Sequence, residues 1–290
     1  MDKTPDRFSQ WAPALFVLLW STGFVGAKFG LPFAEPFTFL FLRYGVVTVI
    51  LGTVLLLWRV PLPRSPAMWG HLAITGLLLH GFYIGGVFVA IAHGMSSGIA
   101  ALIVGIQPLL TAGVAGPLLG ERVTQRQIAG LLLGFAGLTL TVSKTFVQGE
   151  LPAIGLVACL MALLAITFGT VYQKRHVAGV DLRAGAFVQF LATALVFAVL
   201  SITFDTGKID WGPEFLFALG WLCLVLSLGA ISLLWRLIQR GAAAKVASLF
   251  YLVPPVTAVE GYFLFGESLT SLQMIGIAVT ALGVAIINRG

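Results

Sequence analysis

Charged residues are scarce in this sequence. Only 10% of its 290 residues are charged, 17 of them basic and 11 acidic, whereas 59% are hydrophobic and the mean hydropathy is +1.01. A soluble domain carries about 25% charged residues, so this chain has too little polar side chain to cover a surface in water, and a soluble enzyme is excluded. An intrinsically disordered protein is excluded too, because disorder requires low hydrophobicity. Its two cysteines, Cys159 and Cys223, lie in apolar stretches, so no disulfide framework is expected.

Polar stretches long enough to form a water-soluble domain are also absent. The longest gaps between apolar segments, such as 58–69 and 205–213, are too short to fold. A membrane-spanning helix needs about 20 mostly apolar residues. The sequence therefore predicts an all-α polytopic membrane protein with ten spans, at about 11–30, 36–58, 69–91, 96–118, 127–143, 152–173, 184–204, 213–235, 243–265 and 270–288. The first span follows a charged start, as a signal peptide would, but no small-residue cleavage site follows it, so we expect a retained helix.

The distribution of basic residues predicts the orientation of the spans. Ten spans place both termini on one side, which carries 13 of the 17 Lys and Arg residues if it is taken as cytoplasmic; the other side carries 4, namely Lys28, Arg43, Lys144 and Lys208. This asymmetry follows the positive-inside rule. We therefore expect a protein of the inner (plasma) membrane with cytoplasmic N- and C-termini. The net charge of +6 then sets orientation in the lipid bilayer and needs no nucleic-acid partner.

An internal repeat divides the chain at about residue 146. A shift of 147 aligns Pro108 with Pro255, and after a one-residue gap a shift of 146 aligns Gly120-Glu121 with Gly266-Glu267. The same shift of 146 aligns Lys28 with Lys174. Residues 1–146 and 147–290 thus each hold five spans, and an odd number makes the two copies lie in opposite orientation. Inverted repeats are typical of alternating-access carriers, which bind their substrate between the halves.

The sequence resembles the drug/metabolite transporter superfamily in its ten-span branch with two EamA-type repeats. The resemblance covers essentially the whole chain. It is carried by Trp20-x7-Lys28, Arg43, Pro108, Gly120-Glu121-Arg122-x-Thr124, Pro254-Pro255, Gly266-Glu267-Ser268-Leu269-Thr270 and Gly276. Within this superfamily the chain is most similar to the bacterial YddG-type exporters of aromatic and other neutral amino acids. The resemblance therefore implies export of such amino acids, with export of drugs or other small metabolites as the alternative.

Prolines lie in the middle of two predicted spans. Pro108 and Pro255 occupy matched positions, and Pro254 precedes the second. Proline removes a backbone donor and bends a helix, and in a bilayer the freed carbonyls need neighbours or a wet cavity. We interpret the three prolines as hinges or cavity-lining residues, with a packed structural kink as the alternative.

Polar and aromatic side chains at central depth are the candidates for binding the substrate. Such polar groups face the bundle interior or a cavity, and aromatic walls suit a flat ring. At i and i+3, His80 and Tyr83 are expected to share one helical face, although a hydrogen bond between helices is an equally plain role for His80. The candidate substrate-binding residues are Trp20, Phe24, His80, Tyr83, Gln107, Phe168, Ser248 and Tyr251.

Three ionisable residues are predicted at a similar outer depth of the membrane. Lys28, Arg43 and Glu260 are expected to form an ion network that offsets their desolvation and acts as an outer gate. A role for Glu260 in proton coupling is the alternative. Glu121 and Glu267, at turns between helices, are expected to cap or brace the following helices.

One motif points to a different class of protein. Gly94-x-Ser96-x-Gly98 matches the nucleophile elbow of serine hydrolases, but that elbow needs a strand-turn-helix setting. Here it precedes a membrane helix, and its repeat counterpart, Gly241 to Lys245, has no serine. We expect a carrier and no enzyme, with no cofactor and no metal site. Gly-x-x-x-Gly pairs permit close helix contact within a monomer or in a dimer, and the energy source stays open.

Overall fold

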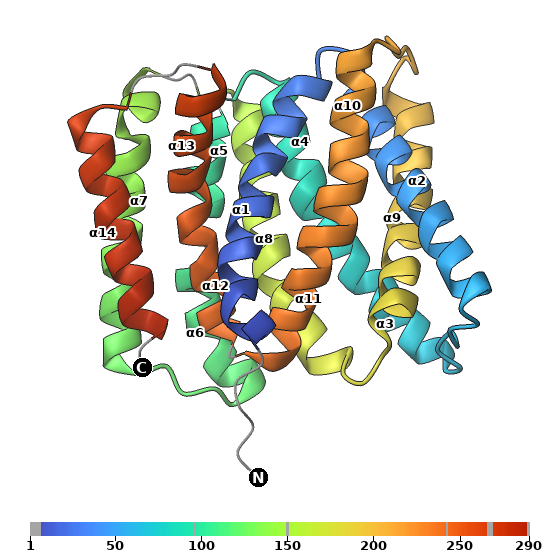
Figure 1. Ribbon diagram of the computed structural model, residues 1–290, viewed down its shortest axis with the longest axis horizontal. Coiled ribbons are helices and arrows are strands. Elements are labelled where there is room, and N and C mark those ends of the chain that lie inside the picture. Colours follow the sequence, from blue (N-terminus) through green and yellow to red (C-terminus); the bar gives the residue numbers. More distant parts are fainter. Residues whose placement is uncertain (1–6, 96, 149–150, 242, 266–268, 289–290) are drawn as a thin grey trace.

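The chain forms a bundle of helices in the computed structural model (Figure 1). The structure describes residues 7–95, 97–148, 151–241, 243–265 and 269–288. Within these ranges it contains helices and one isolated antiparallel bridge, between Ala34 and Ile209, and no strand.

The helices follow one another with short connections. Their bounds are α1 (Arg7–Gly30), α2 (Pro36–Leu57), α3 (Pro66–Gly76), η1 (Leu77–Phe82), α4 (Tyr83–Ala92), α5 (Ser97–Val104), α6 (Gln107–Leu119), α7 (Gln125–Gln148), α8 (Ala153–His176), α9 (Leu182–Phe204), α10 (Pro213–Trp221), η2 (Leu222–Ala230), α11 (Ile231–Arg240), α12 (Ala243–Ser248), η3 (Leu249–Leu252), α13 (Val253–Phe265) and α14 (Ser271–Asn288). Here η1 and η2 are π-helical and η3 is a 3₁₀ turn.

Eight helical stretches of the described chain are long and apolar enough to cross a membrane. Two of them are continuous through a π-helix, at Pro66–Ala92 and Pro213–Arg240. A shorter apolar helix spans Trp11–Gly23, within α1. The sequence prediction of a polytopic helical membrane protein is therefore confirmed.

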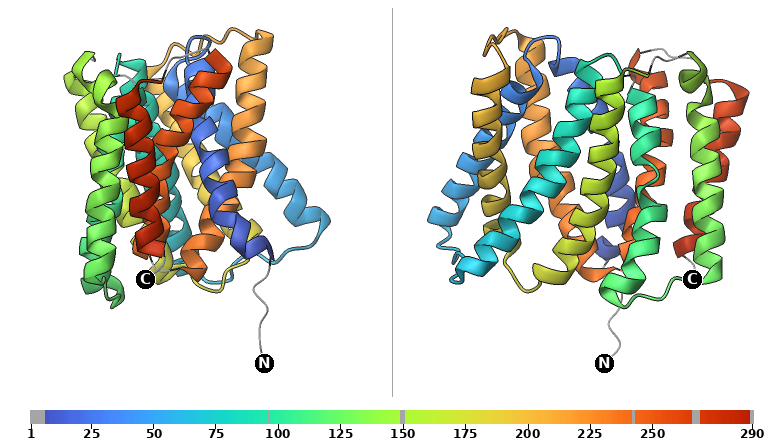
Figure 2. Two further views of the ribbon diagram at one scale, coloured as in Figure 1. Left: turned by 60° about the vertical axis from the view of Figure 1, so that its left-hand side comes forward. Right: turned by 180° about the vertical axis from the view of Figure 1, so that it is seen from behind.

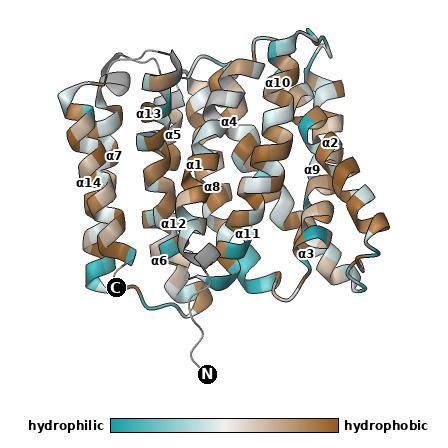
Figure 3. Cartoon of the chain, in the orientation of Figure 1, coloured by the Kyte–Doolittle hydropathy of each residue, from teal (hydrophilic) through white to brown (hydrophobic). Residues whose placement is uncertain are grey.

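The outer surface of the bundle is apolar. Ile202, Leu56 and Phe263 are 86%, 81% and 76% exposed, whereas His80, Gln107 and Gln189 are buried. Hydrophilic residues gather towards the two ends of the bundle, and the middle is largely hydrophobic (Figure 3). This arrangement suits a surface in contact with lipid, because water would penalise so many exposed large apolar side chains.

Helices α7 and α14 pack along each other at one edge of the bundle (Figure 2). Small residues permit this contact: a Cβ on Gly137 would lie 2.8 Å from the Gly276 carbonyl oxygen, and a Cβ on Gly283 would lie 2.7 Å from that of Gly130. Glycine lets membrane helices approach until their backbones touch. The glycines of this pair therefore serve packing within the chain.

Helices α2 and α9 form the corresponding pair at the other edge. The first turn of α1 and the last turn of α14 share one end of the bundle (Figure 1), which we call the basal end; the opposite one is the distal end. At the distal end, the Asp205 carboxylate accepts hydrogen bonds from the Thr38 backbone N–H (2.6 Å) and hydroxyl (2.9 Å). An acidic side chain at a helix N-terminus satisfies free N–H groups, so the end of α9 holds the start of α2.

Candidate functional site

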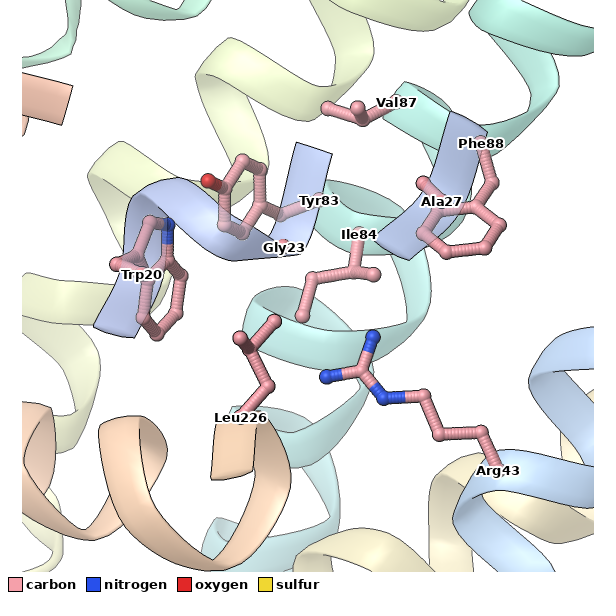
Figure 4. Close-up of a pocket in the computed structure, with 9 residues that line it drawn as sticks. All are labelled: Trp20, Gly23, Ala27, Arg43, Tyr83, Ile84, Val87, Phe88 and Leu226. Atoms are coloured by element: carbon pink, nitrogen blue, oxygen red, sulfur yellow. The ribbon is translucent and has the colours of Figure 1, made fainter. Parts of the chain in front are cut away.

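A small cavity lies among α1, α2, α4 and η2. Its volume is about 40 Å³. As Figure 4 shows, aromatic and aliphatic side chains surround it together with a single charged one; the lining residues are Trp20, Gly23, Ala27, Arg43, Tyr83, Ile84, Val87, Phe88 and Leu226. Because one water needs about 10–15 Å³, the cavity has room for water and is too small for a molecule the size of an amino acid.

The aromatic wall of the cavity consists of Trp20 and Tyr83. Their ring planes are parallel to within 1° and the ring centroids are 6.4 Å apart. Phe250 meets Trp20 edge to face at 5.4 Å, and Phe16 contacts both Trp20 and Phe250. Offset and edge-to-face contacts of this kind hold aromatic rings in fixed orientations, so the wall is rigid and flat.

A second, smaller cavity of about 10 Å³ shares Trp20 and Tyr83 with the first. On its other side lie Gly105, Val253 and Pro254, where two membrane helices are interrupted. The chain turns between α5 and α6 at Gly105–Ile106, and between α12 and α13 it runs through the η3 turn. Interrupted helices within a membrane occur where the backbone is buried in protein or lines a cavity.

Arg43 supplies the only charge among the described residues that line the first cavity. Its side chain is 1% exposed, and its Nε donates a hydrogen bond to the Ser227 hydroxyl at 3.0 Å. The guanidinium carbon lies 5.2 Å from the centre of the Tyr44 ring, a distance suited to a cation–π contact. One terminal nitrogen, Nη2, is buried and has no hydrogen-bond partner among the described residues.

Comparison with known families identifies the chain. The sequence pattern of the EamA-like transporter family matches it twice, over residues 11–143 and 153–289. The chain belongs to the EamA-like transporter family.

Relatives of this EamA-like transporter are found in several bacteria. It is 27% identical to the "Uncharacterized transporter YvbV" of Bacillus subtilis (strain 168), covering 99% of this chain and 94% of the relative. It is 28% identical to the "Uncharacterized inner membrane transporter YedA" of Escherichia coli (strain K12), covering 98% and 93%. A "Probable amino-acid metabolite efflux pump" of the same strain is 24% identical over 94% and 92%. A crystal structure of a 24% identical protein matches with a TM-score of 0.79 over 96% of each chain, which shows a shared fold.

Among the described residues, Arg43 and Glu260 of the predicted ion network do not pair. Arg43 has no carboxylate within 4.0 Å among the described residues, and Glu260 instead accepts a 2.5 Å hydrogen bond from the Ser21 hydroxyl. The two residues face different helices, since Arg43 points to η2 and Glu260 to α1. The side chain of Lys28, the third predicted member, lies outside the described residues, as does Glu267.

His80 and Tyr83 do not share a face as expected. His80 Nε2 lies 3.2 Å from Gln189 Oε1 on α9, whereas the Tyr83 ring faces Trp20 on α1. His80 belongs to the π-helix η1, whose wider turn changes the direction of side chains three residues apart. His80 thus forms a hydrogen bond between helices, the alternative to its predicted role in substrate binding.

Four other predicted binding residues do not line either of the two cavities. Gln107 donates to the Thr111 hydroxyl at 3.0 Å, and Ser248 donates to the Lys245 carbonyl one turn back. The Tyr251 ring packs against α7, where a Cβ on Gly134 would lie 2.8 Å from it. Phe168 is 46% exposed in a groove on the outer surface, so it faces lipid. The side chain of Phe24 lies outside the described part of the chain.

The three prolines all lie at the helix interruptions. Pro108 falls in the first turn of α6, where its missing N–H costs nothing, and Pro254 and Pro255 start α13 in the same way. All three are buried, and Pro254 lines the second cavity. Their positions are those that hinge residues need, and the hinge role itself remains a prediction.

A cluster of hydrogen bonds links three segments at the basal end. The Lys174 ammonium donates to the Glu121 carboxylate at 2.6 Å and to the Gly241 carbonyl. Both carboxylate oxygens of Glu121 also accept from the backbone N–H of Ala243, at 3.1 and 2.9 Å. Glu121 therefore joins the end of α8 to the start of α12, a wider role than bracing the helix that follows it.

Sequence reasoning missed Phe250, Leu226, Ser227 and Gln189. Phe250 takes the cavity position expected for Tyr251 because the 3₁₀ turn η3 rotates the chain there. A signal for Gln189 was present, since the shift of 146 residues that defines the repeat aligns it with Arg43. Leu226 and Ser227 carried no such signal, because one hydroxyl and one leucine in an apolar run are ordinary.

Proposed function

We propose that this EamA-like transporter exports aromatic and other neutral amino acids across the inner membrane by alternating access. The observation that carries the proposal is the cavity between parallel aromatic rings and a buried guanidinium, placed beside two interrupted helices. A ring binds between flat aromatic walls by stacking, and interrupted helices at mid-membrane mark the binding sites of many carriers.

The proposed architecture is two inverted repeats of five helices each. Helices α2 and α9 begin at Pro36 and Leu182, α6 and α13 at Gln107 and Val253, and α7 and α14 at Gln125 and Ser271, each pair 146 residues apart. The π-helices η1 and η2 also overlap under this shift. In Figure 1, α1 rises from the basal end and α8 descends towards it, as inversion requires. The family match over two separate ranges further supports the duplication.

We propose ten crossings of the membrane. Eight are the long apolar helices. The other two are α1 and the interrupted run from α12 through η3 to α13, which covers residues 243–265. With the basal end in the cytoplasm, the basic residues at the ends of α2, α6, α8 and α11 all face inward, as the positive-inside rule demands. The name of the relative YedA, an inner membrane transporter, supports the same location.

The substrate binds in a conformation wider than the one seen. A 40 Å³ cavity cannot hold an amino acid, so the helices around Trp20 and Tyr83 must separate for binding and release. The basal cluster around Glu121 joins elements of both halves. In the proposed transport cycle, this cluster forms when the basal side closes and breaks when that side opens. Bending at Pro108 and at Pro254-Pro255 is the proposed motion.

The amino-acid assignment rests on the walls of the cavity and on two similarities. The sequence resembles the YddG-type exporters, and one relative is named a probable amino-acid metabolite efflux pump. Export of a drug or another metabolite is the second candidate, because the same flat walls suit any planar ring. A serine hydrolase is the remote third, and its Ser96 lies outside the described residues.

Purified protein in liposomes tests these candidates together. Labelled phenylalanine, tryptophan, leucine and a planar drug are followed with and without a pH gradient, against protein-free liposomes. Saturable flux of the amino acids, recovered chemically unchanged, supports the proposal, and dependence on the gradient identifies the energy source. Flux of the drug alone contradicts the amino-acid assignment, and conversion of the substrate indicates a hydrolase.

A further inference from the structure

Arg43 is a buried cation without a counter-ion among the described residues. It is 1% exposed and lies within the membrane-spanning helix α2. In the described part of the chain the ion pairs are Lys174–Glu121 and Arg183–Asp181, and neither involves Arg43. A charge in such surroundings is costly unless it is paired or faces a polar cavity.

The contacts of Arg43 leave one side of its guanidinium free. Nε donates to the Ser227 hydroxyl at 3.0 Å, and the Tyr44 ring lies 5.2 Å from the guanidinium carbon. A neutral hydroxyl and a ring do not cancel a full positive charge. In Figure 4 the guanidinium reaches towards the space between Ile84 and Leu226, and its buried Nη2 has no partner. Arg43 therefore lines the cavity whose other wall is aromatic, and it keeps a buried donor that has no partner among the described residues.

The contact of α2 with the π-helix η2 does not require this charge. Under the shift of 146 residues Arg43 corresponds to Gln189. Gln189 contacts His80 in the π-helix η1, and Arg43 contacts Ser227 in the π-helix η2. A neutral amide thus makes the matched contact in the other half of the chain. The positive charge at position 43 has a purpose other than holding α2 against a π-helix.

We propose that Arg43 binds the carboxylate of the transported molecule and thereby selects organic anions that carry an aromatic or apolar group. This inference rests on the proposed carrier function of the cavity. Guanidinium groups bind carboxylates through charge-assisted hydrogen bonds, and Nη2 is the donor left for one. The ring of the same molecule then stacks on Trp20 and Tyr83, which line the cavity with Arg43.

The lining also predicts which groups of a substrate the site does not recognise. None of the described residues around the cavity is acidic, so the site offers no partner for the ammonium of an amino acid. Aromatic carboxylates without an amino group should be carried as well as amino acids. Amines without a carboxylate should be rejected, because they would place a second positive charge beside Arg43.

The test compares three molecules that differ in one group each. Phenylalanine, 3-phenylpropanoate and phenethylamine are supplied at neutral pH to liposomes that hold wild-type protein, Arg43→Gln or Arg43→Lys, with protein-free liposomes subtracted. Arg64→Gln is the matched control, since it removes a charge from an exposed loop. Size-exclusion profiles and melting temperatures verify that each variant is folded.

We expect the wild type and Arg64→Gln to carry both carboxylates and to reject phenethylamine. Arg43→Gln should weaken the apparent affinity for both carboxylates by about 100-fold or more, since it removes one partner of a buried charge pair. Arg43→Lys keeps the charge but loses the planar fork, so a smaller loss of about tenfold is expected. The selectivity of the wild type tests the inference even if a variant fails to fold.

The outcomes separate this inference from the proposed function. Phenylalanine flux that is equal in wild type and Arg43→Gln, or equal flux of phenylalanine and phenethylamine by the wild type, overturns the carboxylate site and leaves amino-acid export standing. Flux of 3-phenylpropanoate alone, lost in Arg43→Gln, supports the carboxylate site and contradicts amino-acid export. Failure of the wild type to carry either carboxylate overturns both.

Discussion

The ammonium of Lys174 lies 2.6 Å from the carboxylate of Glu121 and so ties the end of α8 to the turn after α6. The side chains are only 24% and 17% exposed, so water screens the pair weakly. Glu121 also accepts from the Ala243 backbone N–H. One carboxylate thus holds three segments together at the basal end.

Loss of this carboxylate should open the basal end. Glu121→Gln leaves Lys174 without its ionic partner, and we expect the closed conformation to lose about 1–3 kcal/mol. A cysteine introduced at Ala101, which lines the second cavity, should then react faster with a maleimide added from the basal side. The parent for both proteins lacks Cys159 and Cys223. Equal labelling rates with and without Glu121 would mean that the pair does not control access.

Trp20 should control the flux of aromatic substrates. Trp20→Ala removes the ring that lies parallel to Tyr83, and we expect at least a tenfold loss, since a pocket contact of this size is worth about 1–3 kcal/mol. Trp20→Phe keeps an aromatic wall and should lose less. Phe204→Ala is the matched control, because it also replaces an aromatic residue by alanine but at a side chain that is 69% exposed. Full flux in Trp20→Ala would remove the residue from the site.

The pair of His80 and Gln189 should be structural. His80→Leu leaves Gln189 Oε1 buried without a donor, so we expect a loss of about 1–3 kcal/mol of unfolding free energy. The double variant His80→Leu/Gln189→Leu removes both polar groups and should recover part of that loss. A double-mutant cycle of melting temperatures in detergent measures the coupling. Additive losses would show that the two side chains act independently.

The contact of α7 with α14 should tolerate no added methyl group. Gly137→Ala would place its Cβ 2.8 Å from the Gly276 carbonyl oxygen, so the helices must separate, at a cost of about 1–3 kcal/mol. Gly113→Ala is the matched control, because a Cβ there meets nothing within 4 Å. It should be neutral or slightly stabilising, since alanine favours helix. Similar melting temperatures for the two variants would contradict the close contact.

The distal end should weaken in acid. Hydrogen bonds from the Thr206 hydroxyl and backbone N–H, at 2.7 and 2.6 Å, hold the pKa of the Glu35 carboxyl below its usual value of 4.5. Because the folded-state pKa is the lower one, the ionised carboxylate stabilises the fold above pH 4.5, and this contribution disappears as the pH falls through the lowered pKa. Wild type and Glu35→Gln should therefore differ in melting temperature at neutral pH and converge as the pH falls through the lowered pKa of Glu35. A difference in melting temperature that persists in acid would show that the ionised Glu35 carboxylate is not its cause.

Spans and interruptions were predictable because they depend on local properties. Runs of apolar residues predicted most of the helices, and the prolines at 108 and 254–255 marked the places where α6 and α13 begin. Side-chain direction was predictable only while the helix was regular. At the π-helix η1 the side chains of His80 and Tyr83 point in different directions, and at the η3 turn Phe250 lines the second cavity where Tyr251 was expected. Neither irregularity has a signature in the residues that form it.

The sequence by itself determined that the chain enters a membrane, where its helices lie and which family it resembles, since composition and repeat spacing are properties of the chain alone. Which side chains meet at the cavity was decided by the tertiary structure. Lipid is as apolar as the interior of the bundle, so an apolar pattern cannot tell Phe168, which faces outward, from Trp20, which faces inward. Only the packing of α1 and α2 against α4 and η2 brings Arg43 to the aromatic wall.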